Sequence, residues 1–307
     1  MSKSIQNIEF KTVDHVVLRG FFYKAAQAGP RPCIIMAPGI GGLKEQFLPD
    51  FAERFQEAGY GVLLYDHRNF GSSEGSLRDE VDPNQQARDY SDAFDFAASL
   101  PDVDESRIVF WGSSMSGGVA IYAAAFDKRI RAVVVQVPFA SGAALEGPFA
   151  KILPGVYEDR RSIKAGAAPG LTQIFAQNSK DAKDPNCTSL TADPALIPFI
   201  EELENRKIRW EGAITTQSIQ HLVSFEPVSV VHRISPTPLL VVAADRDHTS
   251  ATAQQLKLYA AALEPKELVL LQNTDHFMPY VGATFKKNIK AQLDFLAKVL
   301  RDDEVEL

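Results

Sequence analysis

The most informative segment of this chain is WGSSMSGG at residues 111–118. It follows a short apolar run at residues 107–110 and precedes an alanine-rich segment at residues 119–126. A strand, a tight turn of small residues and a helix form the setting in which a Gly-x-Ser-x-small motif is a nucleophile elbow. Small residues two before and two after the serine allow the sharp bend, because larger side chains would collide across the turn.

Two serines of this turn are candidates for the nucleophile. Ser114 lies closer to the strand end, between Gly112 and Ser116, and leaves residues 116–118 to pack the start of the helix against the sheet. We therefore predict Ser114 as the nucleophile and keep Ser116 as the alternative. A turn rich in serine and glycine can also simply cap a helix, since serine is a favoured cap residue. The rest of the chain distinguishes these interpretations.

Length and composition indicate a globular protein with a large core. The chain has 307 residues, of which 45% are hydrophobic and 23% charged, as is ordinary for soluble domains. A net charge of -7 without a basic cluster argues against nucleic acid as a partner. No apolar run reaches the roughly 18 residues of a membrane span. Two cysteines and a start without an apolar signal region predict a reduced, cytoplasmic protein.

Apolar runs and helix signals alternate along most of the chain. Runs rich in Val, Ile and Leu, without polar alternation, indicate a largely parallel sheet with helices on both faces. The first two strands are instead joined by a turn at Asp14, which predicts an antiparallel pair. Strands are expected at residues 8–12, 16–24, 31–37, 62–65, 107–110, 132–137, 239–243 and 268–271, and helices at residues 48–58, 83–100, 119–126 and 284–300.

One long stretch, residues 139–236, interrupts this alternation between two core strands. It contains prolines, aromatic side chains and a short helical run at residues 198–209. A structureless loop of that length is implausible, so we expect an insertion with its own helices over the crevice where open α/β sheets bind ligands. We predict a core domain of residues 1–138 and 237–307, covered by a helical lid at residues 139–236 that shapes an apolar pocket. A decorative or dimerising subdomain is the alternative.

An activated serine needs a base, and the base needs a carboxylate that orients it. Among six histidines, His276 follows the last predicted strand and precedes the final helix, where its ring can reach Ser114. Asp247 lies far enough past the preceding strand to approach His276, whereas Asp245 is nearer the strand end and could instead cap the turn. We predict Ser114, Asp247 and His276 as nucleophile, orienting acid and base. They occur in the chain order that the α/β-hydrolase topology requires.

Acyl transfer through a serine also needs two N–H donors that hold the developing oxyanion, each contributing about 3 kcal/mol. The residue after the nucleophile, Met115, is expected to supply one. The other is expected from the glycine-rich loop after the strand at residues 31–37, where Ile40 lies between Gly39 and Gly41. This loop lacks the spacing and the Lys-Ser/Thr pair of a phosphate-binding loop. We therefore expect no cofactor, and no cluster of ligand residues in the sequence predicts a metal.

These motifs together resemble the α/β-hydrolase superfamily over nearly the whole chain. Within it, the chain resembles the branch of fungal polyketide transferases and thioester hydrolases, which has dienelactone-hydrolase-like relatives. The resemblance rests on APGIGGLKE at residues 37–45, YDHRNFGSS at residues 65–73, Asp82-Pro83 with Gln86, Asp89 and Tyr90, the Ser114 elbow, and HFMPY at residues 276–280. The elbow departs from the common pattern, because Ser116 replaces the usual glycine and adds a hydroxyl near the site.

The resemblance implies a serine hydrolase-type enzyme that acts on an ester or thioester. We expect hydrolysis or acyl transfer of a polyketide-derived acyl chain in secondary metabolism, with the apolar substrate carried on a synthase's carrier domain and no cofactor. The alternatives are a general carboxylesterase on small esters, a cyclase, and a ligand-binding protein of the same fold without chemistry. A homodimer, the acyl donor and the choice between water and an alcohol as acceptor stay open.

Overall fold

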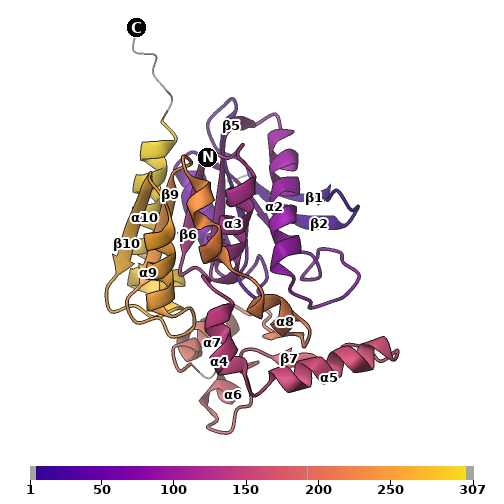
Figure 1. Cartoon of the computed structure of the whole chain (residues 1–307). Helices are drawn as coiled ribbons and strands as arrows, with labels where there is room; N and C mark the ends of the chain where they lie inside the picture. Colours follow the sequence, from indigo (N-terminus) through magenta and orange to yellow (C-terminus); the bar gives the residue numbers. More distant parts are fainter. Residues whose placement is uncertain (1–4, 192, 302–307) are drawn as a thin grey trace.

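A computed structural model describes residues 5–191 and 193–301 of the chain. Within these ranges the centre is an eight-stranded sheet of order β1-β2-β4-β3-β5-β6-β9-β10 (Figure 1). β2 pairs antiparallel with both β1 and β4, and the remaining neighbours pair parallel. This confirms the expected fold class and the antiparallel first pair. The strands are β1 (Ile5–Lys11), β2 (Val17–Tyr23), β3 (Arg31–Ala37), β4 (Gly61–Tyr65), β5 (Val103–Ser113), β6 (Ala132–Gln136), β9 (Leu239–Ala244) and β10 (Lys266–Leu271).

Helices cover both faces of this sheet. α2, α3 and α9 pack on one face, and α1 and α10 pack on the other. Helix α9 was not among the sequence predictions, although the alternation of strands and helices leaves room for one between β9 and β10. The helices of the core are α1 (Leu48–Glu57), α2 (Pro83–Ala98), α3 (Met115–Phe126), α9 (Thr252–Ala261) and α10 (Gly282–Val299).

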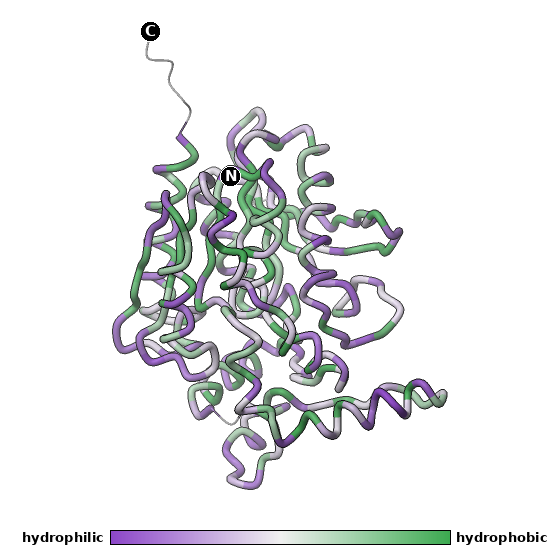
Figure 2. The backbone as a smooth tube through the Cα atoms, viewed as in Figure 1, coloured by the Kyte–Doolittle hydropathy of each residue, from purple (hydrophilic) through white to green (hydrophobic). Residues whose placement is uncertain are grey.

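The central strands form the hydrophobic core. Every residue of β4, β6 and β9 is buried, and Figure 2 shows these strands mainly in green while purple gathers at the periphery. β1 lies at the sheet edge and exposes most of its residues. Because an exposed strand has no continuous apolar run, the sequence pattern marks its ends poorly, and its bounds differ from the predicted residues 8–12. β5 begins before the predicted residue 107, because an irregular pairing with β3 extends it.

The stretch between β6 and β9 forms a layer beyond the carboxyl ends of the parallel strands (Figure 1). It contains helices, as expected, and also a two-stranded antiparallel sheet of β7 and β8, which no sequence pattern indicated. The predicted helical run at residues 198–209 corresponds to helix α7, which begins and ends earlier in the chain. The elements are η1 (Ala143–Leu145), α4 (Glu146–Phe149), α5 (Leu153–Lys164), β7 (Leu171–Gln173), α6 (Ser179–Lys183), α7 (Leu196–Asn205), β8 (Ala213–Thr215), α8 (Ser218–Val223), η2 (Pro227–Ser229) and η3 (Val231–Ile234).

The described ranges contain neither a membrane-spanning helix nor a cluster of metal-ligating side chains. In residues 5–191 and 193–301, no helix has the length and apolar character needed to cross a bilayer. The same ranges contain no group of three or more His, Cys, Asp or Glu side chains arranged to hold a metal ion.

Candidate active site

Ser114 lies in a sharp turn between β5 and α3. Its backbone has a φ of 56° and a ψ of -125°, and a positive φ is a strained conformation for a residue other than glycine. The turn requires glycine at position 112, because a Cβ there would lie 2.1 Å from the carbonyl oxygen of Ser116. The Ser114 N–H donates to the carbonyl of Gln136 at 3.0 Å, and its own carbonyl accepts from Phe139 at 2.8 Å. The next strand and the loop after it therefore hold the strained turn.

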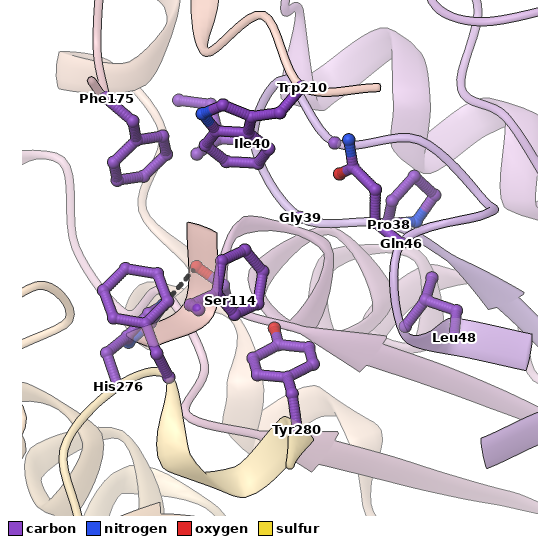
Figure 3. A pocket seen from close by; sticks show the side chains of 13 residues that line it. Pro38, Gly39, Ile40, Gln46, Leu48, Ser114, Phe175, Trp210, His276 and Tyr280 are labelled. Carbon is purple, nitrogen blue, oxygen red and sulfur yellow. Dashed lines mark hydrogen bonds between the residues drawn. The ribbon is translucent and has the colours of Figure 1, made fainter. Parts of the chain in front are cut away.

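Three side chains from three loops meet at the carboxyl edge of the sheet. The Ser114 hydroxyl donates to Nε2 of His276 at 2.9 Å (Figure 3), and Nδ1 of His276 donates to Oδ2 of Asp247 at 2.7 Å. The exposed fractions are 9% for Ser114, 2% for His276 and 3% for Asp247. Burial strengthens such a chain of hydrogen bonds, because little water competes with it. The structure thus brings together the three residues that the sequence selects.

Asp247 is held by three donors. Besides His276, the Ser250 N–H donates to its Oδ1 at 2.7 Å, and Nε2 of Gln255 donates to its Oδ2 at 2.8 Å. Burial raises the pKa of this carboxyl group, but the charge and hydrogen bond of His276 and the other two bonds outweigh burial and lower the pKa below its ordinary value. Gln255 is a site residue that the sequence analysis missed, because it lies on the unpredicted helix α9.

The second acid candidate, Asp245, makes different contacts. Its Oδ1 accepts the Thr274 N–H at 2.9 Å, and the Arg246 N–H donates to the Thr274 carbonyl at 2.9 Å. Backbone hydrogen bonds from Thr274 and then Asn273 lower the pKa of the Asp245 carboxyl group. Asp245 therefore caps the turn, as one interpretation of the sequence expected, and ties the acid loop to the loop that carries His276.

The second nucleophile candidate, Ser116, is completely buried in the first turn of α3. The Tyr90 hydroxyl donates to the Trp111 carbonyl at 2.7 Å and lies 2.8 Å from the Ser116 hydroxyl. Because the single Tyr90 proton is used, the Ser116 hydroxyl donates to Tyr90. The hydroxyl that distinguishes this elbow from the common pattern thus anchors the turn to helix α2 and does not contact His276.

The two predicted oxyanion-hole residues, Ile40 and Met115, line the same cavity as Ser114. Met115 is the first residue of α3, where a backbone N–H has no partner within the helix. Gly39 packs closely on the nucleophile, since a Cβ on it would lie 3.3 Å from the Cβ of Ser114, and Ile40 follows it directly. In the described part of the chain, neither the Ile40 nor the Met115 N–H has a hydrogen-bond acceptor. Both N–H groups are therefore unoccupied, and their role as oxyanion donors stays a prediction.

A buried polar network fixes the loop that follows His276. Ser113 shares a hydrogen bond with the Tyr280 hydroxyl and accepts one from Gln136 at 3.0 Å. Asn288 and Gln292 of α10 donate to the same Gln136 at 2.6 and 3.0 Å. Tyr280 belongs to η4 (Met278–Tyr280), so the network joins β5, β6 and α10 to the histidine loop. Sequence analysis missed this network, because its members lie far apart in the chain and follow no motif.

Two cavities meet at Ser114. The larger has a volume of about 490 Å³, and the smaller has about 50 Å³ and mainly aromatic walls (Figure 3). Ile40, Ser114 and Phe175 line both cavities, whereas His276 lines only the smaller one. The apolar residues that the insertion contributes to the larger cavity are Phe139, Leu145, Pro148, Phe149, Ile174, Phe175, Leu190, Pro194 and Leu222.

Comparison with known families identifies the fold family. The family model described as serine aminopeptidase, S33, matches residues 28–279 of the chain. This chain belongs to the S33 family of α/β-hydrolases. The S33 assignment makes it a member of an enzyme family and confirms the superfamily that the motifs indicated.

This member of the S33 family is similar to fungal proteins over nearly its whole length. A polyketide transferase, grgF, from a Penicillium species is 35% identical over 292 residues, with 95% of this chain and 96% of that protein covered. A thiohydrolase, aneE, from Aspergillus aculeatus is 31% identical over 307 residues, with 97% and 94% covered. The crystal structure of the α/β-hydrolase GrgF from Penicillium sp. sh18 matches with a TM-score of 0.85 at 32% identity, covering 97% of this chain and 99% of that one. The predicted resemblance to the fungal transferase and thiohydrolase branch is thereby confirmed.

Proposed function

We propose that this chain hydrolyses or transfers the acyl group of an apolar thioester or ester, through an acyl-enzyme on Ser114. The observation that carries the proposal is the unbroken chain of hydrogen bonds from Ser114 through His276 to Asp247 beside a large, mainly apolar cavity. The names of the relatives, polyketide transferase and thiohydrolase, support a polyketide-derived acyl chain as the substrate.

The first half of the reaction forms the acyl-enzyme. His276 accepts the Ser114 proton at Nε2 as Oγ bonds to the acyl carbonyl carbon, and Asp247 stabilises the imidazolium that results. The Ile40 and Met115 N–H groups hold the oxyanion of the tetrahedral intermediate. The bond between carbon and the leaving sulfur or oxygen then breaks, and His276 gives its proton to the leaving group.

The second half releases the acyl group. Water or an acceptor alcohol loses its proton to Nε2 of His276 as its oxygen bonds to the acyl carbon. The second tetrahedral intermediate uses the same two N–H donors. His276 then returns the proton to Oγ of Ser114 as the acyl–serine bond breaks, which yields a free acid or a new ester.

The insertion acts as a lid that selects the acyl chain in this proposal. Its side chains form most of the apolar wall of the larger cavity, whose volume of about 490 Å³ lies in the range of small-molecule sites. A long acyl chain gains affinity there by removing its methylenes from water, with an upper limit of about 0.8 kcal/mol for each.

Acyl chain length provides the test. Octanoyl N-acetylcysteamine has six methylenes more than the acetyl thioester, which sets an upper limit of about 5 kcal/mol. Incomplete burial and lid closure reduce this limit, and we expect kcat/KM to be at least tenfold higher for the octanoyl thioester. Steady-state kinetics over the C2 to C8 series measure the trend. Equal efficiency for acetyl and octanoyl substrates would favour the small-ester carboxylesterase and reduce the insertion to a structural or dimerising role.

Two matched variants in the insertion test whether the larger cavity causes the dependence of kcat/KM on acyl chain length. Phe149 lines the larger cavity, whereas Tyr157 on α5 is 47% exposed. Phe149→Ala should flatten the dependence on chain length, and Tyr157→Ala should leave it unchanged. Labelling of Ser114 by a fluorophosphonate probe, absent in Ser114→Ala, separates an enzyme from a ligand-binding protein of the same fold.

Three finer expectations belong to the same proposal. Delivery of the substrate on a carrier domain is tested by turnover of an octanoyl carrier protein against the free thioester. A homodimer formed by two copies of this chain is tested by light scattering. A cytoplasmic location is tested by fractionation of cells that express the protein.

A further inference from the structure

We propose that the small cavity is the subsite for the leaving group and the acceptor, and that it admits water or an unbranched apolar alcohol to the acyl-enzyme. This inference rests on the proposed function, because it assumes an acyl group on Ser114. It names the acceptor class, which the sequence left open between water and an alcohol.

The position of His276 assigns roles to the two cavities. The same imidazole protonates the leaving group and later takes the proton of the acceptor, so both must lie on the side of Ser114 that faces the ring. His276 lines the smaller cavity and not the larger one. The larger cavity therefore receives the acyl chain, and Ile40, which lines both, lies at the carbonyl between them.

The walls of the small cavity disfavour a polar acceptor. Trp210, Phe175 and Tyr280 surround the hydrogen bond between Ser114 and His276 (Figure 3). The indole N–H of Trp210 donates to the Ala176 carbonyl at 2.7 Å, and the Tyr280 hydroxyl is bonded to Ser113.

The amide of Gln46, which also lines this cavity, is engaged in the same way. It donates to the Arg209 carbonyl at 2.7 Å and accepts from the Leu43 N–H at 3.1 Å. The polar ends of these lining side chains are thus bonded within the protein. The surface offered to an acceptor is therefore mostly apolar.

The size of the cavity limits the width of the acceptor. Its volume is about 50 Å³, enough for a few water molecules at roughly 10–15 Å³ each, whereas an apolar cavity that holds a benzene ring is about 150 Å³. A thin chain, such as the thiol arm of a thioester or a linear alcohol, can lie there and extend outward. A ring on the acceptor fits less well there than a thin chain, unless an aromatic wall is removed.

The experiment measures how the acyl-enzyme divides between two primary alcohols. Wild-type protein is incubated with p-nitrophenyl octanoate and equal concentrations of 1-butanol and benzyl alcohol, and octanoic acid and both esters are quantified by liquid chromatography. We expect butyl octanoate to exceed benzyl octanoate at least tenfold. Trp210→Ala opens the wall and should bring the two esters within about threefold of each other. Phe199→Leu, at the same wall, gives the same test if Trp210→Ala does not fold.

Phe149→Ala is the matched control, because Phe149 lines the larger cavity alone. It should change the preferred acyl length and leave the ratio of butyl to benzyl ester as in the wild type. Comparable amounts of the two esters from wild-type protein, or relaxation by Phe149→Ala and not by the Trp210 and Phe199 variants, would overturn the assignment. Absence of an octanoyl adduct on Ser114 by intact mass would instead overturn the proposed function itself.

Discussion

Replacing Asp247 with asparagine tests how the acid orients His276. The carboxylate accepts three hydrogen bonds, from His276, Gln255 and the Ser250 N–H. An amide has one accepting oxygen and one NH₂ donor in the same two places. If its oxygen faces Ser250, its NH₂ faces Nδ1 of His276, which must then accept. The ring proton moves to Nε2, and Nε2 can no longer accept the proton of Ser114.

The opposite orientation of the amide is also unfavourable. Its oxygen then keeps the bonds to His276 and Gln255, but its NH₂ meets the Ser250 N–H, and a buried donor without an acceptor costs about 1–3 kcal/mol. The second orientation therefore does not exclude the first, and the first imposes the wrong tautomer on His276. The same substitution lowers kcat by about 10⁴ in a serine protease, equivalent to about 5 kcal/mol. We expect Asp247→Asn to lower kcat for p-nitrophenyl octanoate by about 10³ to 10⁴.

Asp245→Asn is the matched control, two residues away in the same loop. An amide oxygen at this position can still accept the Thr274 N–H, so we expect kcat to change by less than about fivefold and the melting temperature to fall. Initial rates and thermal unfolding of both variants give the comparison. Comparable losses of kcat for Asp245→Asn and Asp247→Asn, with unchanged melting temperatures, would refute the assignment of the acid.

Three further predictions follow from the elbow and from one buried histidine. Ser114→Ala should abolish turnover and probe labelling with the fold intact, whereas Ser116→Ala should keep activity and lose about 1 kcal/mol with the Tyr90 bond; the reverse pattern would make Ser116 the nucleophile. Gly112→Ala should fail to give soluble, active protein, because its Cβ would clash with the Ser116 carbonyl. Burial lowers the pKa of His67 from 6.5 to about 3. Between these two pH values the unfolded chain binds a proton that the folded chain does not. The unfolding free energy should therefore fall by about 1.4 kcal/mol for each unit by which the pH decreases in this window. His67→Phe should lack this contribution in urea unfolding at pH 7 and 5.

The sheet and its catalytic edge could be predicted because their signals are local. A buried parallel strand is a continuous apolar run, and the elbow is a short motif whose small residues the turn itself requires. Ser114, Asp247 and His276 each follow such a strand, so their convergence needs only the rule that parallel strands end at one edge. The choice of Ser114 over Ser116 rests on distance from the strand end; in the structure the Ser114 hydroxyl is bonded to His276 and the Ser116 hydroxyl to Tyr90.

The supporting contacts could not be predicted, because they depend on the packing of distant elements. Gln255 reaches Asp247 from a helix with little amphipathic pattern, and Gln136 meets Asn288, which lies 152 positions further along the chain. The strands β7 and β8 have only three residues each, too few for a periodic signal. Such contacts follow from the fold once it is known and leave no motif in the sequence.

The insertion touches both loops that carry the proposed base and acid. Phe199 of α7 packs on Phe277 with ring centroids 5.1 Å apart, and Phe277 is itself 5.0 Å from the His276 ring. On the other side, the Thr249 hydroxyl donates to Asp193 of the insertion at 3.1 Å. If the insertion acts as the proposed lid, an acyl chain that fills the larger cavity stabilises the contacts between the insertion and these two loops. Binding energy used in this way aligns the reacting groups and raises kcat, whereas energy used only to hold the substrate lowers KM. Across the C2 to C8 series, kcat should thus rise together with kcat/KM. If only KM changes with chain length, the insertion binds the acyl chain without aligning His276.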